Sequence, residues 1–265
     1  MGRQASNAAQ QGRRLPSTLP FSTLLSAWDT WVFTGALVIV LPCFAYFCLY
    51  RGAQGQGYFG RISKAGTYLW ITFSLWSTLG FLAVVAHRHH LSMADLGQHL
   101  RHPTRTLTMT AILLSVMIVL SALDFWKHRQ MPPDALEQRL AKLRHFFPSS
   151  PSEIVTFAAM AISAGICEEL LYRGWLLHLI GASTGSVWLG LLLSSVAFGL
   201  GHAYQGPQGI LATGFVGLVL GLIFMWVGSL VPVQILHAFI NLSSGLMCAY
   251  LLAGSSRSGG KVSSP

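Results

Sequence analysis

Three charged residues stand together in an otherwise apolar half of the chain. Between Ile154 and Ser256 the only charged side chains are Glu168, Glu169 and Arg173. An ionisable side chain at the centre of a membrane helix costs about 2.5–3.5 kcal/mol on insertion scales. Three such residues together therefore indicate compensating polar partners and a functional role. We therefore take this cluster as the candidate site.

The spacing of the cluster gives its two glutamates different tasks. On a helix, Glu169 and Arg173 lie four residues apart with the acid first, which favours an ion pair. The adjacent Glu168 points about 100° away around the helix. One carboxylate can thus be neutralised by the arginine while the other stays free, and a free carboxylate in a dry site can take a proton from water as a general base. Spacing alone leaves open which glutamate is the base.

Polar residues of two later apolar segments could join this cluster. His202 ends the sequence Phe198-Gly-Leu-Gly-His202, while His237 and Asn241 are four residues apart and share one helix face. Two polar groups that face the interior of a helix bundle can donate hydrogen bonds to a developing oxyanion. His178 has no such polar company, and we expect it at the membrane interface. These residue types fit hydrolysis by activated water.

Membrane helices must position these side chains. The chain is 52% hydrophobic and only 9% charged, whereas soluble domains have about 25% charged residues. Segments of about 20 apolar residues suffice to cross the hydrocarbon core. We therefore predict an all-α fold, a polytopic transmembrane helix bundle of about seven spans, near residues 31–50, 66–86, 106–126, 154–180, 187–201, 208–227 and 231–253.

The character of the sequence predicts four regions. Residues 1–30 form a polar N-terminal tail, 31–150 hold N-terminal transmembrane helices with basic loops, and 151–253 hold the candidate catalytic core. The Ser/Gly-rich end, 254–265, is typical of a disordered tail. Within the second region, residues 134–147 have apolar positions at helical spacing, which predicts an amphipathic helix on the membrane surface or a solvated linker helix.

Charge and cysteine content limit the partners. The net charge of +9 is concentrated in the N-terminal half. Basic loops beside apolar spans set topology or meet anionic lipid head groups, so we expect the lipid bilayer and no nucleic acid as a partner. These loops are basic on both sides of the membrane, which leaves the orientation open.

Four cysteines inside apolar spans predict no disulfide framework: Cys43, Cys48, Cys167 and Cys248.

Three motifs follow one another in separate apolar spans. They are Glu168-Glu169-x-x-x-Arg173, Phe198-x-x-x-His202 and His237-x-x-x-Asn241. In this order the set resembles the signature of the CPBP family, the CAAX-protease and bacteriocin-processing intramembrane endopeptidases. The resemblance covers roughly residues 150–252.

The resemblance implies a role for each motif residue. Glu168 would activate the attacking water, and His202 would help to hold it. His237 and Asn241 would stabilise the tetrahedral oxyanion. The remaining pair, Glu169 with the arginine four residues later, would order and neutralise the site. Reasoning from the residues alone agrees on a division between the two glutamates.

The implied function is an intramembrane endopeptidase in an integral, multi-pass protein, such as one of a bacterial inner membrane. Its partner would be a membrane-associated peptide or protein: a prenylated CAAX-type substrate, a leader peptide or a C-terminal sorting signal. One alternative is a zinc metalloendopeptidase with Glu168, His202 and His237 as ligands. We favour a metal-free site, because a zinc-bound His237 would leave Asn241 as the sole oxyanion donor. A noncatalytic scaffold or immunity protein of the same fold is the other alternative.

Other intramembrane protease chemistries lack their residues. The sequence has no H-E-x-x-H motif for a zinc site, no Asp after Asp134, and no Lys between Lys142 and Lys261. A nucleophilic mechanism stays open but leaves the charged cluster without a role. Its candidates are Ser194, Ser195, Ser243, Ser244 and Cys167.

Overall fold

The chain folds into a bundle of apolar helices. The computed structural model describes residues 19–50, 62–132, 135–136, 138 and 146–259, and within these ranges it has helices and no strands. Six helices are long and apolar enough to cross a membrane, and a seventh apolar helix, Val187–Gly201, is shorter. The predicted all-α bundle of about seven spans is confirmed, and the protein is an integral, multi-pass membrane protein.

The first four crossings comprise these elements. The first is built from α3 (Trp28–Gly35), the π-helix η2 (Ala36–Val40), α4 (Leu41–Ala45) and the π-helix η3 (Tyr46–Tyr50). The second and third are α6 (Lys64–Arg88) and α7 (Pro103–Arg129). The fourth runs without interruption through α9 (Pro151–Glu169), the π-helix η4 (Leu170–Leu176) and α10 (Leu177–Thr184).

The last three helices of the bundle follow after short turns. They are α11 (Val187–Gly201), α12 (Gly206–Val227) and α13 (Leu230–Gly259). A short 3₁₀ turn, η5 (Ala203–Gln205), joins α11 to α12. The last helix continues beyond residue 253, where the sequence pattern places its end.

Local sequence explains where these helices begin. The side chains of Ser63, Ser150 and Ser186 accept hydrogen bonds from backbone N–H groups in the first turns of α6, α9 and α11. Such caps satisfy donors that the helix itself cannot pair. Gly228 ends α12 at φ 78°, a left-handed conformation that suits glycine.

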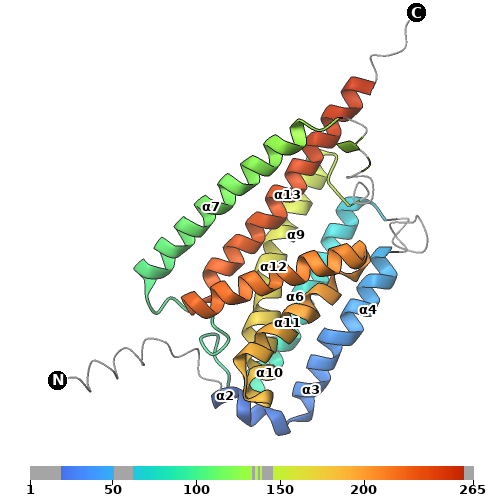
Figure 1. Ribbon diagram of the computed structural model, residues 1–265. Helices are drawn as coiled ribbons and strands as arrows, with labels where there is room; N and C mark the ends of the chain where they lie inside the picture. Colours follow the sequence, from blue (N-terminus) through green and yellow to red (C-terminus); the bar gives the residue numbers. More distant parts are fainter. Residues whose placement is uncertain (1–18, 51–61, 133–134, 137, 139–145, 260–265) are drawn as a thin grey trace, which may run out of the picture.

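Helix α9 lies at the centre of the bundle (Figure 1). It packs against α6 and α13, while α7 covers the outer side of α13 and α11 packs between α10 and α12. Small residues permit the close approach: a Cβ on Gly165 of α9 would lie 2.8 Å from the backbone N of Ala238 and the backbone O of Gln234 in α13. The helix that carries the two glutamates is therefore held tightly against the helix that carries His237 and Asn241.

Residues 19–26 are not part of a polar tail. They form α2 (Leu19–Ser22) and the 3₁₀ turn η1 (Thr23–Ser26), and Phe21 and Leu24 are fully buried in the main core. The Phe21 ring lies 6.0 Å from the Trp175 ring in an edge-on contact. Residues 19–26 are thus held in the core by packing against η4, although their own sequence has no helical periodicity.

Two predicted features lie largely outside the described residues. Of the predicted surface helix at 134–147, only a few residues are described; Leu136 and Phe147 pack with Cys248 and Leu251 of α13. The end of the chain from residue 260 is likewise outside the description.

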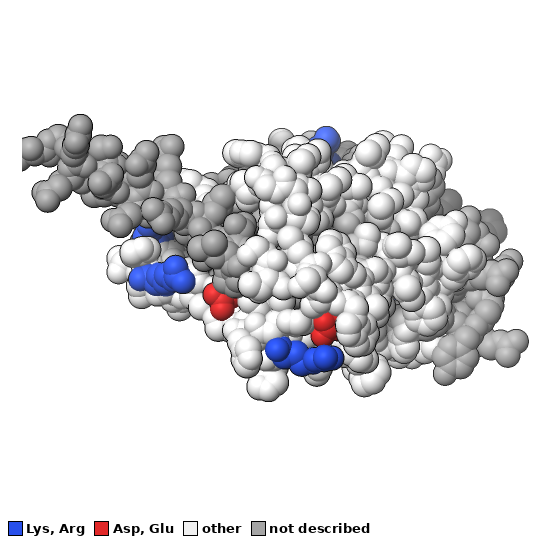
Figure 2. Space-filling model, turned by 90° about the horizontal axis from the view of Figure 1, so that it is seen from below, with Lys and Arg blue, Asp and Glu red and all other residues white. Residues whose placement is uncertain are grey.

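Charged side chains gather at the helix ends. At the start of α3, Asp29 Oδ1 lies 3.0 Å from His89 Nε2, and Asp29 Oδ2 lies 3.4 Å from Arg88 Nη1 at the end of α6. Even the face seen from below the bundle shows only scattered charges (Figure 2). Large hydrophobic side chains are exposed along the helix sides, as expected where lipid rather than water surrounds them.

Candidate active site

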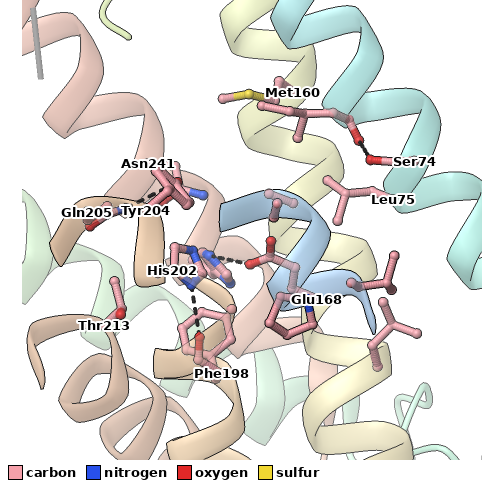
Figure 3. Close-up of a pocket in the computed structure, with 18 of the residues that line it drawn as sticks. Ser74, Leu75, Met160, Glu168, Phe198, His202, Tyr204, Gln205, Thr213 and Asn241 are labelled. Atoms are coloured by element: carbon pink, nitrogen blue, oxygen red, sulfur yellow. Dashed lines mark hydrogen bonds and ion pairs between the residues drawn. The ribbon is translucent and has the colours of Figure 1, made fainter. Parts of the chain in front are cut away.

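The predicted site residues converge from four parts of the bundle. A cavity of about 440 Å³ is lined on one side by Glu168 of α9, His202 after α11, and His237 and Asn241 of α13. In Figure 3, Glu168 and His202 point into the same space from different helices. Two predicted residues do not line the cavity, namely Glu169 and Arg173, which are buried behind its wall.

The ion pair expected from the spacing is present. Arg173 Nη1 donates to Glu169 Oε1 at 2.9 Å, and the side chains are 1% and 0% exposed. The second guanidinium nitrogen, Nη2, donates to the Gly217 carbonyl at 2.7 Å. The guanidinium carbon also lies 4.7 Å from the centre of the Phe198 ring, a cation–π contact. The arginine is thus tied to three helical segments at once.

Gly217 has a more specific role than the sequence indicates. The pattern Gly214, Gly217 and Gly221 predicts only close helix packing. A Cβ on Gly217 would lie 3.2 Å from Arg173 Nη2 and 3.0 Å from the Phe198 ring. Glycine at this position therefore leaves room for the guanidinium and presents a carbonyl to it.

His237 lies between the two glutamates. Its Nδ1 is 2.8 Å from Glu169 Oε1, so Nδ1 donates to the carboxylate. Its Nε2 is 3.6 Å from Glu168 Oε2, which is an ionic approach rather than a hydrogen bond. When His237 is protonated, two positive charges, on His237 and Arg173, balance the two carboxylates. The sequence motifs alone do not reveal this bridging position.

Glu168 is the accessible carboxylate of the pair. Its side chain is 17% exposed, and among the described residues that line the cavity it is the one acid. Its Oε2 atom is buried and has no hydrogen-bond partner in the described part of the chain. Glu168 thus makes no hydrogen bond with a described residue, and the exposed part of its side chain is available to a molecule in the cavity.

His202 and Asn241 present unused polar atoms to the cavity. His202 Nδ1 lies 2.9 Å from the Phe198 carbonyl oxygen, which can only accept, so Nδ1 is the donor. In a neutral ring Nε2 is then an acceptor. Asn241 lies one turn after His237 on α13 and has no hydrogen bond with a described residue. Its amide is available to donate.

His178 lies inside the bundle. The prediction that it lies at the membrane interface, made because no other polar residue accompanies it in the sequence, is wrong. It is 3% exposed, and Nδ1 donates to the Gly174 carbonyl at 2.9 Å. Its ring is stacked on Phe21 at 5.1 Å and meets Phe224 edge-on at 5.7 Å. Aromatic packing explains this residue without catalysis.

Three of the four alternative serine nucleophiles donate hydrogen bonds within their own helices. Ser194 and Ser195 both donate to the Leu191 carbonyl, at 3.1 and 2.7 Å, and Ser243 donates to Ile240 at 3.2 Å. Ser244 lines the cavity. Such bonds to the preceding helical turn are ordinary for a serine within a helix.

The described side chains do not assemble a metal site. Within the ranges that the structure covers, no three His, Cys, Asp or Glu residues are grouped so that they could hold a metal ion. Glu168, His202 and His237 share the cavity wall. Nδ1 of each histidine donates a hydrogen bond, which leaves Nε2 as the ring atom that could bind a metal.

Comparison with known proteins identifies the part of the chain that contains the site. The model of a family described as "Type II CAAX prenyl endopeptidase Rce1-like" matches residues 150–243. No curated protein and no solved structure matches the chain. The match covers every motif residue and implies an intramembrane protease of the CAAX type. Residues 150–243 are therefore similar to the Rce1-like family, in agreement with the resemblance of the three motifs.

Proposed function

We propose that this protein hydrolyses a peptide bond of a membrane-presented substrate and uses Glu168 as its general base. The observation that carries the proposal is the division of the two carboxylates. Oε1 of Glu169 is bound by Arg173 and His237, and Glu169 is fully buried behind the cavity wall. The Glu168 side chain is 17% exposed, lines the cavity and makes no hydrogen bond with a described residue. A base must have a free lone pair within reach of the water it activates.

The reaction assigns one step to each polar group. Glu168 takes a proton from water, and the water oxygen attacks the carbonyl carbon of the scissile peptide. The Nε2–H of protonated His237 and the Asn241 amide donate to the resulting oxyanion. Glu168 then returns its proton to the leaving nitrogen as the C–N bond breaks. Glu169 keeps the His237 ring oriented throughout by accepting the hydrogen bond from Nδ1.

The apolar part of the cavity supports a lipid-soluble or apolar substrate. Hydrophobic side chains from α4, α6 and α9 line it, including Leu41, Trp70, Phe157 and Met160. A prenylated CAAX-type peptide, an apolar leader peptide and a C-terminal sorting signal are all compatible with such walls. Comparing the membrane-bound peptides of cells with and without this gene tests the proposal: a shortened peptide present only with the gene is expected. Identical profiles would favour a noncatalytic scaffold.

Asn241→Ala should lower kcat by about a hundredfold or more, with a modest change in KM. Removal of one oxyanion donor typically raises the barrier by about 2.7–4 kcal/mol. The measurement is steady-state cleavage of the identified peptide by purified protein. A pure rise in KM would instead place Asn241 in substrate binding.

Removal of metal should leave the activity intact. This expectation rests on the role of His237 as an oxyanion donor, because a zinc-bound His237 would leave Asn241 alone for that task. The purified protein is treated with a strong zinc chelator, and zinc content and cleavage are measured before and after. Stoichiometric zinc, with activity lost on chelation and restored by added zinc, would instead make Glu168, His202 and His237 metal ligands.

A further inference from the structure

Tyr172 has a hydroxyl group for which the motifs give no role. The residue is 7% exposed and lines the same cavity as Glu168 and His202. Its hydroxyl has no hydrogen bond with any residue that the structure describes. A buried tyrosine usually finds a partner for its O–H group, so this hydroxyl is available to a molecule in the cavity.

The helix places Tyr172 beside the base. Tyr172 follows Glu168 by four residues, just as Arg173 follows Glu169. The first pair therefore shares the face that lines the cavity, and the second pair shares the face behind the wall. Both partners lie in the π-helix η4, and π-helical turns occur often at functional sites.

The hydroxyl extends from η4 to the end of α11. The Tyr172 ring meets the Phe198 ring edge-on at 5.2 Å. A Cβ on Gly201 would lie only 3.1 Å from the Tyr172 hydroxyl oxygen. Gly201 directly precedes His202, so the hydroxyl lies between the helix of the base and the second polar wall of the cavity.

An attacking water in this position needs one more hydrogen bond. Such a water donates one proton to Glu168 and the other to Nε2 of His202, which is an acceptor because Nδ1 donates to the Phe198 carbonyl. Of its two lone pairs, one attacks the peptide carbon. The other needs a donor, and neither a carboxylate nor an unprotonated Nε2 supplies one.

We propose that the Tyr172 hydroxyl donates this third hydrogen bond and thereby orients the attacking water. The proposal rests on the proposed hydrolysis at Glu168. The bond fixes the rotation of the water, so that one lone pair points at the substrate while the proton on its way to Glu168 stays aligned. Glu168 accepts the proton, and the phenol keeps its own.

Tyr172→Phe tests the proposal, because it removes one oxygen atom and keeps the ring on Phe198. We expect kcat to fall about tenfold, the size expected for one lost hydrogen bond, with KM changed less than about twofold. The assay follows product release from a synthetic farnesylated CAAX peptide, or from whichever peptide the membrane comparison identifies. The matched control is Tyr250→Phe, at a position 60% exposed on α13, which should cleave at the wild-type rate.

A second variant tests the location of the hydroxyl. In Gly201→Ala the new methyl group would crowd the Tyr172 oxygen, so kcat should fall with the thermal midpoint in detergent nearly unchanged. In the Tyr172→Phe background the same change should have little further effect, since there is no longer an oxygen to displace. If the fold-loss in kcat of the double variant equals the product of the two single losses, the proposed position of the Tyr172 hydroxyl beside Gly201 is contradicted.

The outcomes separate this inference from the proposed function. A wild-type kcat for Tyr172→Phe, or a loss that appears only in KM or in the thermal midpoint, would overturn the role of Tyr172. Provided that Glu168→Gln is inactive in the same assay, the glutamate mechanism would still stand. If Glu168→Gln cleaves normally, the proposed function itself fails.

Discussion

Glu168→Gln should reduce cleavage by about 10²–10⁴-fold, the contribution expected from a general base. The amide keeps the size and shape of the side chain but accepts a proton from water far less readily. Glu169, buried behind the wall and bound by Arg173 and His237, cannot replace it. The measurement is single-turnover cleavage by purified protein, with membrane insertion and accumulation checked alongside.

A matched control is available on the same helix. Glu153, at the start of α9, accepts hydrogen bonds from the backbone and hydroxyl of Ser149 and is not among the residues that line the cavity. Glu153→Gln removes a carboxylate from the same helix and should cleave at nearly the wild-type rate. Near-normal cleavage by Glu168→Gln would rule out the glutamate mechanism.

Arg173→Met should lower the free energy of unfolding by about 3–5 kcal/mol, the usual cost of breaking a buried ion pair by removing one partner. The change leaves the fully buried Glu169 carboxylate without the guanidinium and the Gly217 carbonyl without its donor. Thermal or denaturant unfolding in detergent measures the loss, which should accompany reduced accumulation in the membrane.

The double variant Glu169→Gln with Arg173→Met distinguishes charge from packing. Glu169→Gln alone strands the arginine in the bundle, so each single change leaves one buried charge, while the double change leaves none. The double variant should therefore be more stable than the sum of the single losses predicts. Additive losses would mean that the pair contributes packing rather than charge compensation.

The fold and the members of the site follow largely from local sequence. Apolar runs of about 20 residues mark the spans, and serine caps mark where α6, α9 and α11 begin. The i, i+4 spacing of Glu169 and Arg173 predicts their ion pair, which is present at 2.9 Å. Such features depend on residues close together in the chain, where periodicity and spacing are informative.

The remaining features depend on contacts between distant segments. His237 bridges to Glu169, 68 positions earlier in the chain, and Arg173 bonds the carbonyl of Gly217, 44 positions later. Phe21 is buried against Trp175 although its neighbours give no helical pattern. A single sequence does not encode such contacts in any local spacing. The bridging position of His237 and the place of Tyr172 in the cavity wall therefore emerge only from the folded chain.

The shortness of α11 predicts that the proposed activity depends on bilayer thickness. A helix of 15 residues spans about 22 Å, whereas a hydrocarbon core is about 30 Å thick. The turn at Ala203–Gln205 therefore cannot reach the second surface of an undeformed bilayer, unless lipids thin around it or water follows it inward. Lipids with shorter acyl chains would bring this turn and His202 closer to the head groups. The length of the lipid acyl chains would thus determine how far below the head groups a water molecule and a scissile bond must lie to reach Glu168.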